Sequence, residues 1–259
     1  MDRDGSAYLT FSFVRQIVRV GPDGRTHVLA TLPAPAHAQT PKAFVGGIAR
    51  ARDGTLYVTY ATGTADLTGV WAVRPGGRPH RVAALPADGL PNGLALGERT
   101  HRVHVTDSVH GVVHRVPASG GGATVRAEGD ALRPSASAGA NGLKLHGGAV
   151  WVTNLDKGTV LRIPLTAHGT AGPIQVRATG MPSIDDCAFT GRGDTLLAAR
   201  DDDEVDLVRP DGTHAAALTA ADGLRSPTSV AVHADEVYVP SAACLTGADP
   251  NLLTARLDR

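Results

Sequence analysis

Three oxygen-bearing residues, Asn92, Asn141 and Asp185, each open a short apolar run, at intervals of 49 and 44 residues, and Asp186 follows the third of them. Amide and carboxylate oxygens suit a hard cation such as Ca²⁺, which takes about 6 to 8 oxygen ligands. Zinc is disfavoured, because the sequence contains neither an HExxH nor a CxxC motif. We therefore predict that Asn92, Asn141 and Asp185 converge on calcium or another divalent cation.

The Asn-Gly pairs at Asn92 and Asn141 have a second interpretation. Asn-Gly is the commonest signal of a hairpin turn, so these residues would then only form turns or cap strand ends. The metal interpretation rests on position: both pairs open a strand instead of joining two strands, and an aspartate stands at the third equivalent position, Asp185.

An internal repeat positions these residues. Similar segments start at Gly46, Asn92, Asn141, Asp185 and Thr228, with spacings of 46, 49, 44 and 43 residues. This is about the length of one four-stranded propeller blade. Within each unit, apolar and polar residues alternate between turns such as PDG and PGG, which is typical of antiparallel strands and not of helices. The sequence predicts an all-β, six-bladed β-propeller of four-stranded antiparallel blades.

The two ends of the chain match incomplete blades. Residues 6–32 resemble the second, third and fourth strands of a unit, and residues 252–259 resemble only a third strand. We expect the first blade to lack its inner strand and the last blade to lack its outer strand. Residues 1–259 are interpreted as one propeller domain that is incomplete at its N-terminus, with Met1 inside a longer protein.

Composition narrows the possible partners. Lys plus Arg and Asp plus Glu both number 25, so the chain has no net charge to attract nucleic acid or an anionic membrane. No apolar stretch approaches the roughly 18 residues that a membrane helix needs. We expect a small-molecule substrate and neither nucleic acid nor membrane as partner. As written the chain would be cytoplasmic, or secreted if a signal peptide lies upstream of Met1; its oligomeric state is not predicted.

A second set of polar residues stands at the end of the second strand of each unit. In an antiparallel blade these ends share a rim with the starts of the inner strands, and the links on that rim are long and irregular, so we place the site at the mouth of the central channel. For two members, Asp107 and Asn154, a turn-stabilising role is the alternative. The acidic run at 201–204 is interpreted as a solvated turn. The predicted substrate contacts are Tyr60, Asn154, Arg200 and Ser241.

The motifs PNGLAL, ANGLKL and IDDCAF, with VHVTDS, VWVTNL and LRIPL, resemble the calcium-dependent six-bladed propellers of the gluconolactonase, regucalcin and paraoxonase superfamily, which also includes strictosidine-synthase-like proteins. The resemblance implies a cation at the top of the channel. Asn92, Asn141 and Asp185 match three of the family's ligands, and Asp186 matches the place of an additional oxygen ligand in some members. The family's first-blade glutamate has no counterpart, which implies weaker calcium binding.

This resemblance implies calcium-dependent hydrolysis of a lactone or other ester. Asp185 would serve as ligand and base, and Asp186 or Asp107 would be the alternative base. Two other functions stay open. One is a metal-dependent lyase resembling streptogramin lyase, which has seven blades, a magnesium ion and a histidine base. The other is a propeller that binds a ligand or partner without catalysis.

Overall fold

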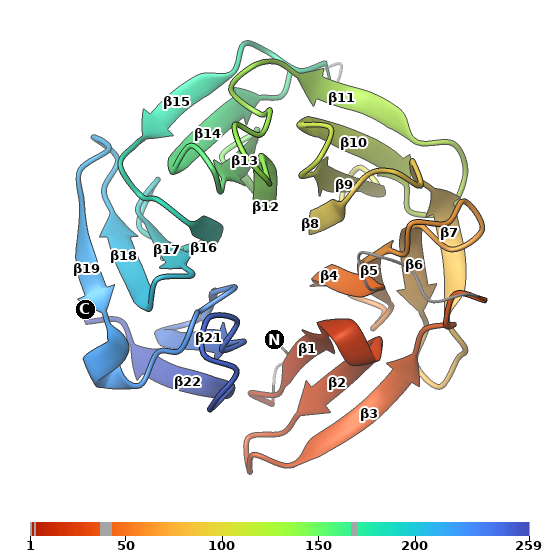
Figure 1. The fold of residues 1–259 in the computed structure, drawn as a ribbon, viewed down its shortest axis with the longest axis horizontal. Helices are drawn as coiled ribbons and strands as arrows, with labels where there is room; N and C mark the ends of the chain where they lie inside the picture. The colour runs from red at the N-terminus through yellow and green to blue at the C-terminus, as the bar shows by residue number, and fades with distance from the viewer. Residues whose placement is uncertain (1, 3, 37–42, 167–169, 259) are drawn as a thin grey trace. The chain divides into compact units, whose positions relative to one another are not determined.

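The computed structural model describes residues 2, 4–36, 43–166 and 170–258, and Figure 1 traces the chain. In this part of the chain the strands form six antiparallel sheets of three or four strands, joined by turns and two short 3-10 helices, Ser12–Val14 and Ala220–Asp222. The fold is a six-bladed β-propeller, as the repeat predicts. No helix among these residues is long and apolar enough to cross a membrane.

The chain divides into two compact units, residues 1–126 and 127–259. The first unit contains the sheets β1-β2-β3, β4-β5-β6-β7 and β8-β9-β10-β11, of which β11 ends just beyond residue 126. Their bounds are β1 Ala7–Phe11, β2 Gln16–Val20, β3 Thr26–Thr31, β4 Phe44–Arg50, β5 Leu56–Ala61, β6 Gly69–Val73, β7 His80–Ala84, β8 Pro91–Gly97, β9 Arg102–Asp107, β10 Val112–Pro117 and β11 Thr124–Glu128.

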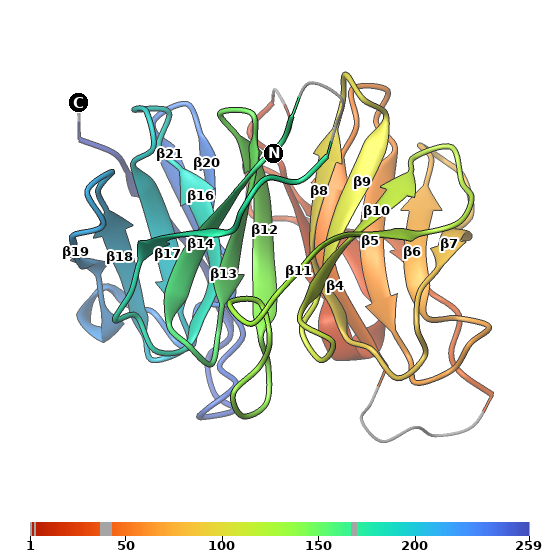
Figure 2. The same cartoon turned by 90° about the horizontal axis from the view of Figure 1, so that it is seen from above.

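The second unit contains the sheets β12-β13-β14-β15, β16-β17-β18-β19 and β20-β21-β22; Figure 2 shows β12, β13 and β14. Their bounds are β12 Ala140–His146, β13 Ala149–Asn154, β14 Thr159–Pro164, β15 Gln175–Ala178, β16 Ile184–Phe189, β17 Leu196–Arg200, β18 Glu204–Val208, β19 His214–Leu218, β20 Ala231–His233, β21 Glu236–Ser241 and β22 Asn251–Arg256.

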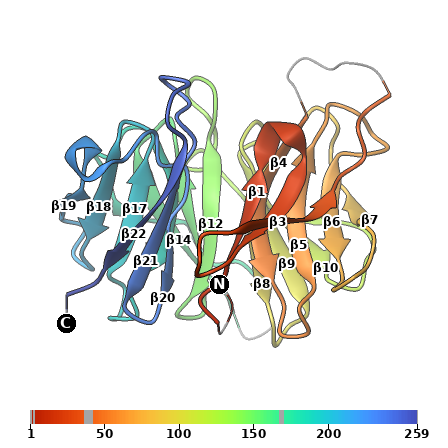
Figure 3. The same ribbon diagram turned by 90° about the horizontal axis from the view of Figure 1, so that it is seen from below.

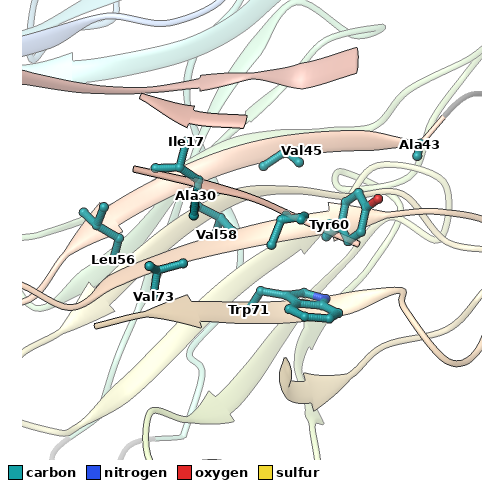
Figure 4. Close-up of a cluster of buried hydrophobic side chains, with 10 residues drawn as sticks. Ile17, Ala30, Ala43, Val45, Leu56, Val58, Tyr60, Trp71 and Val73 are labelled. Atoms are coloured by element: carbon teal, nitrogen blue, oxygen red, sulfur yellow. The ribbon is translucent and has the colours of Figure 1, made fainter. Parts of the chain in front are cut away.

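Apolar side chains from adjacent sheets form the cores of both units. In the first unit, Ile17, Val45 and Val58 are fully buried, and the Tyr60 and Trp71 rings meet edge to face with centroids 6.1 Å apart (Figure 4). In the second unit, a cluster around Trp151 joins the β12–β15 and β16–β19 sheets. Because the middle strands are covered on both faces, their sequences are nearly continuous apolar runs, such as GVWAV in β6.

Three threonines occupy the same place in three sheets. The Oγ1 of Thr10 in β1 donates to the Gly46 carbonyl at 2.8 Å, Thr59 in β5 donates to the Asn92 carbonyl at 2.7 Å, and Thr153 in β13 donates to the Asp185 carbonyl at 2.6 Å. Because β5 and β13 are second strands, β1 is a second strand as well. The prediction that the first blade lacks its inner strand is therefore confirmed.

The last sheet also has three strands, β20, β21 and β22, which Figure 3 shows. The strand β22 pairs with β21 from Ser241↔Asn251 to Glu236↔Arg256, which is the position of a third strand. The prediction that the last blade lacks its outer strand is confirmed.

Candidate functional site

Each complete blade begins its inner strand with a break in register. The shifts lie between Val45 and Ile48, Pro91 and Leu94, Ala140 and Leu143, and Ile184 and Asp186. The unpaired residues at these β-bulges include Gly46, Asn92, Asn141 and Asp185. A bulge redirects the side chain that it carries. The predicted ligands thus occupy equivalent positions within strands, and neither Asn-Gly pair is a hairpin turn.

Glycines in these bulges allow neighbouring inner strands to approach closely. A Cβ on Gly142 would lie 2.4 Å from the Asp186 Oδ1 and 2.8 Å from the Asp185 carbonyl oxygen. A Cβ on Gly47 would lie 2.7 Å from the Asn92 carbonyl oxygen. These contacts are too short for any side chain, so glycine is needed after the ligand position to bring adjacent bulges together.

Asp185 lies beside Asp201, which follows the end of β17. Arg200 pairs with Ile184 across the bulge, and the Asp201 amide donates to the Ser183 carbonyl at 3.0 Å. Burial raises the pKa of Asp185 well above its ordinary value, and the charges of Asp201 and Asp186 raise it further. Burial also raises the pKa of Asp201, to about 6. Two adjacent carboxylates in such a place favour uptake of a proton or a cation.

The interpretation of residues 201–204 as a solvated turn is wrong for Asp201. Its Oδ1 atom is buried and has no hydrogen-bond partner among the residues that the structure describes. Asp203 is also engaged, since its Oδ1 accepts the Ser226 amide at 2.6 Å. Chain folding around the β17–β18 turn, which a local acidic composition does not reveal, accounts for the difference.

Asp186 takes part in a different set of contacts. Both of its carboxylate oxygens accept from the Lys144 ammonium, at 2.6 and 2.7 Å, and Oδ2 also accepts from the Ser229 hydroxyl at 2.7 Å. Burial opposes the charge on Lys144, but Asp186 outweighs it and the Lys144 pKa is raised. This ion pair links β12 to β16. Lys144 and Ser229 thereby hold both oxygens of the Asp186 carboxylate in place.

In the first unit, Asp107 is completely buried and heavily bonded. Its Oδ1 accepts the amides of Leu90, Val109 and His110, and its Oδ2 lies 3.0 Å from the His110 Nδ1. Burial alone would raise the Asp107 pKa, but the His114 ring, with its Nε2 3.9 Å away, and hydrogen bonds from backbone amides lower it to about 2. Asp107 is therefore ionised at neutral pH and a weak base. Its contacts correspond to the turn-stabilising alternative.

The side chains that close the second strands share one structural role. Each bonds to the backbone of the loop that leads into the inner strand of its own blade. Tyr60 donates to the Pro33 carbonyl at 2.7 Å, Asn154 donates to the Ala131 and Arg133 carbonyls, and the Ser241 Oγ accepts the Arg225 amide at 3.2 Å. Tyr60, Asn154 and Ser241 are buried. Their predicted contact with substrate stays a prediction.

Arg200 also bonds to the loop that leads into the inner strand of its blade, and it pairs with three carboxylates. Its Nε donates to the Pro182 carbonyl at 3.2 Å, and its guanidinium pairs with Asp202, Glu204 and Asp206 at 2.5, 2.6 and 3.2 Å. Burial opposes the charge, but these carboxylates raise the Arg200 pKa. Substrate contact by Arg200 likewise stays a prediction.

Sequence reasoning missed Asp201 as a partner of Asp185, and Lys144 and Ser229 as partners of Asp186. One signal for Lys144 was present, since it is one of three lysines in the chain and stands between two leucines of an inner strand. Cys187 and Cys244 are free thiols. Burial raises the pKa of Cys244, and the charges of Asp201 and Asp185 raise it further, so this thiol lies near the carboxyl pair.

Within the described ranges, no group of three or more His, Cys, Asp and Glu side chains is arranged to hold a metal ion. Any cation site would therefore combine carboxylates with amide or carbonyl oxygens. Asp185 and Asp201 supply the carboxylates, and Asn141 stands at the bulge of the adjacent inner strand in the same unit. This donor set fits calcium and not zinc. Asn92 stands at the equivalent bulge of the first unit, and its role as a ligand stays a prediction.

The sequence matches no protein-family profile and no curated protein. Solved structures share the fold. Regucalcin from Agrobacterium tumefaciens, a calcium-binding protein, is similar at 18% identity and a TM-score of 0.67, over 93% of this chain and 80% of that one. A protein assigned as a gluconolactonase is 17% identical with a TM-score of 0.67, over 91% and 81%. Virginiamycin B lyase from Staphylococcus aureus is 17% identical with a TM-score of 0.63, over 92% and 74%. At these identities the likeness establishes the propeller fold.

Proposed function

We propose that this chain is a calcium-dependent hydrolase that acts on a lactone or another ester. The observation that carries the proposal is the pair Asp185 and Asp201, two half-buried, electrostatically coupled carboxyl groups at an inner-strand bulge, one of which has a buried Oδ1 with no partner among the described residues. Two neighbouring negative charges of this kind are stabilised by a shared proton or by a bound cation. The chemistry of the pair therefore favours a bound divalent cation.

Asp185, Asp201 and Asn141 would hold the ion in the second unit. All three offer oxygen atoms, which Ca²⁺ prefers over nitrogen or sulfur. When bound, calcium would polarise the carbonyl of an ester and stabilise negative charge that develops on its oxygen. Regucalcin, a calcium-binding protein, and the gluconolactonase-assigned protein have the same fold, which is compatible with this proposal.

The surrounding residues assign separate roles to the two neighbouring aspartates. Asp186 is paired with the Lys144 ammonium and accepts a hydrogen bond from the Ser229 hydroxyl, so it serves to fix the position of β16 against β12. Asp185, whose pKa is raised, would accept the proton of a water molecule that attacks the ester. Asp107, with its pKa of about 2, is a weaker candidate for this role.

The test is hydrolysis of a panel of lactones and aryl esters by the full chain, in calcium and in chelator. Calcium-dependent turnover should disappear in Asp185→Asn. It should persist in Asp130→Asn, because the Asp130 side chain is 94% exposed and lies outside the pair. Wild-type turnover in Asp185→Asn would contradict the proposal. Calcium binding without turnover of any substrate would favour a non-catalytic binding propeller. The six blades do not favour the lyase alternative, for which seven were expected.

A further inference from the structure

A row of three basic side chains crosses the third sheet of the first unit, away from the carboxyl pair. His104 on β9 is the direct antiparallel partner of Arg115 on β10. Arg126 lies on the next strand, β11, where the neighbouring Thr124 hydroxyl donates to the Arg115 carbonyl. The charges of Arg126 and Arg115 both act on His104, which places the three groups close together.

None of these three side chains forms a hydrogen bond or an ion pair with any other residue in the part of the chain that the structure describes. His104 is only 4% exposed, and its Nδ1 is buried without a partner, as is the Nε of Arg126. Burial and the two arginines lower the His104 pKa to about 4. Buried polar atoms are nearly always satisfied, and like charges on adjacent strands destabilise a sheet. The three side chains therefore have unpartnered donors and no negative charge that balances the two arginines.

The side chains at the equivalent positions of other blades each have at least one hydrogen-bond partner. Two residues before the shared threonine, the second blade has Tyr57, whose hydroxyl donates to the Ala118 carbonyl at 3.2 Å. The fourth blade has Trp151, whose Nε1 donates to the His146 carbonyl at 3.2 Å. Next to Trp151, Arg162 bonds to the Gln175 Oε1 at 3.1 Å and lies over the indole ring. Arg177, which stands in the fourth blade where Arg126 stands in the third, also has a buried Nε without a partner among the described residues, but its Nη2 donates to the Pro210 carbonyl at 3.1 Å. A row in which no side chain has a partner is therefore not a general feature of the fold.

We propose that His104, Arg115 and Arg126 bind a phosphate-type oxyanion. Two guanidinium groups present several N–H donors in the fixed planar geometry that matches phosphate oxygens. The His104 imidazole, beside the two arginines, adds one further N–H donor. The ligand is inorganic phosphate or the phosphate group of a monoester, and the site is independent of the proposed hydrolase.

The experiment is isothermal titration calorimetry on the full chain at constant ionic strength. The probes are sodium phosphate, phenyl phosphate as a monoester, and sodium acetate. Wild type should bind one phosphate or phenyl phosphate per chain and bind acetate at least about tenfold more weakly. The tighter of the two phosphate probes identifies whether the free anion or a monoester is the preferred form.

Arg115→Gln and Arg126→Gln should each weaken phosphate binding by about tenfold or more, because each removes hydrogen bonds to a charged ligand. Arg162→Gln is the matched control, since it changes the equivalent arginine of the next blade, and it should bind like wild type. His104→Phe places an aromatic residue where other blades have one, so it should fold and bind more weakly. Absence of one-to-one binding in wild type, equal affinity for acetate, or an equal loss in Arg162→Gln would overturn the proposal.

Discussion

Replacing Asp201 by asparagine should make the calcium-free protein more stable at neutral pH. The Asp201 pKa of about 6, against an ordinary value of 3.8, corresponds to about 3 kcal/mol. Because the folded-state pKa is raised, the stabilisation is present below about pH 4 and is lost as the pH rises through 6. Wild type in chelator should lose about 3 kcal/mol over this range, and Asp201→Asn should not.

The assay is thermal unfolding in chelator at pH values from 4 to 8, with the melting temperature measured by calorimetry. At about 2 to 4 °C per kcal/mol for a chain of this size, Asp201→Asn should melt about 6 to 12 °C above wild type at pH 7. Asp130→Asn, on an exposed loop, should follow wild type at every pH. Identical pH dependence in wild type and Asp201→Asn would refute the reasoning that the two carboxyls compete for one proton.

Three other substitutions test the packing around the site. Lys144→Met should destabilise the fold by about 2 kcal/mol in denaturant titration, because it leaves the Asp186 carboxylate without its cation; an unchanged midpoint would show that the ion pair contributes nothing. Thr153→Val should cost about 1 to 2 kcal/mol in the same assay, since its hydroxyl bonds to the Asp185 carbonyl, and no loss would contradict that role. Asp107→Asn should cost about 2 kcal/mol at pH 7 and progressively less as the pH falls from about 4 towards 2, because its pKa is lowered; a cost that does not vary with pH would refute this assignment.

The propeller was predictable because its local signals repeat. Thr10, Thr59 and Thr153 stand in similar strand motifs, and each donates to the bulge of the next inner strand. The alternation of apolar residues and the tight turns specify the antiparallel strands, and the repeat length specifies the blades. The equivalence of Asn92 and Asn141 followed from the same periodicity.

The partners within the site were not predictable, because they depend on register and on contacts between sheets. Asp201 comes beside Asp185 only when Arg200 pairs with Ile184 across a bulge, which sequence alternation does not reveal. Lys144 and Asp186 lie 42 residues apart and meet because neighbouring inner strands pack closely. Local composition carries no information on either contact.

Thermal unfolding at pH 7 with and without calcium tests the central claim most directly, with magnesium at equal concentration as the control cation. A ligand present at about 100 times its Kd stabilises the fold by about 2.7 kcal/mol, so calcium should raise the Tm by roughly 5 to 10 °C. The increase should vanish in Asp185→Asn. An identical Tm in calcium and in chelator for wild type would contradict the account of Asp185 and Asp201 as a cation site.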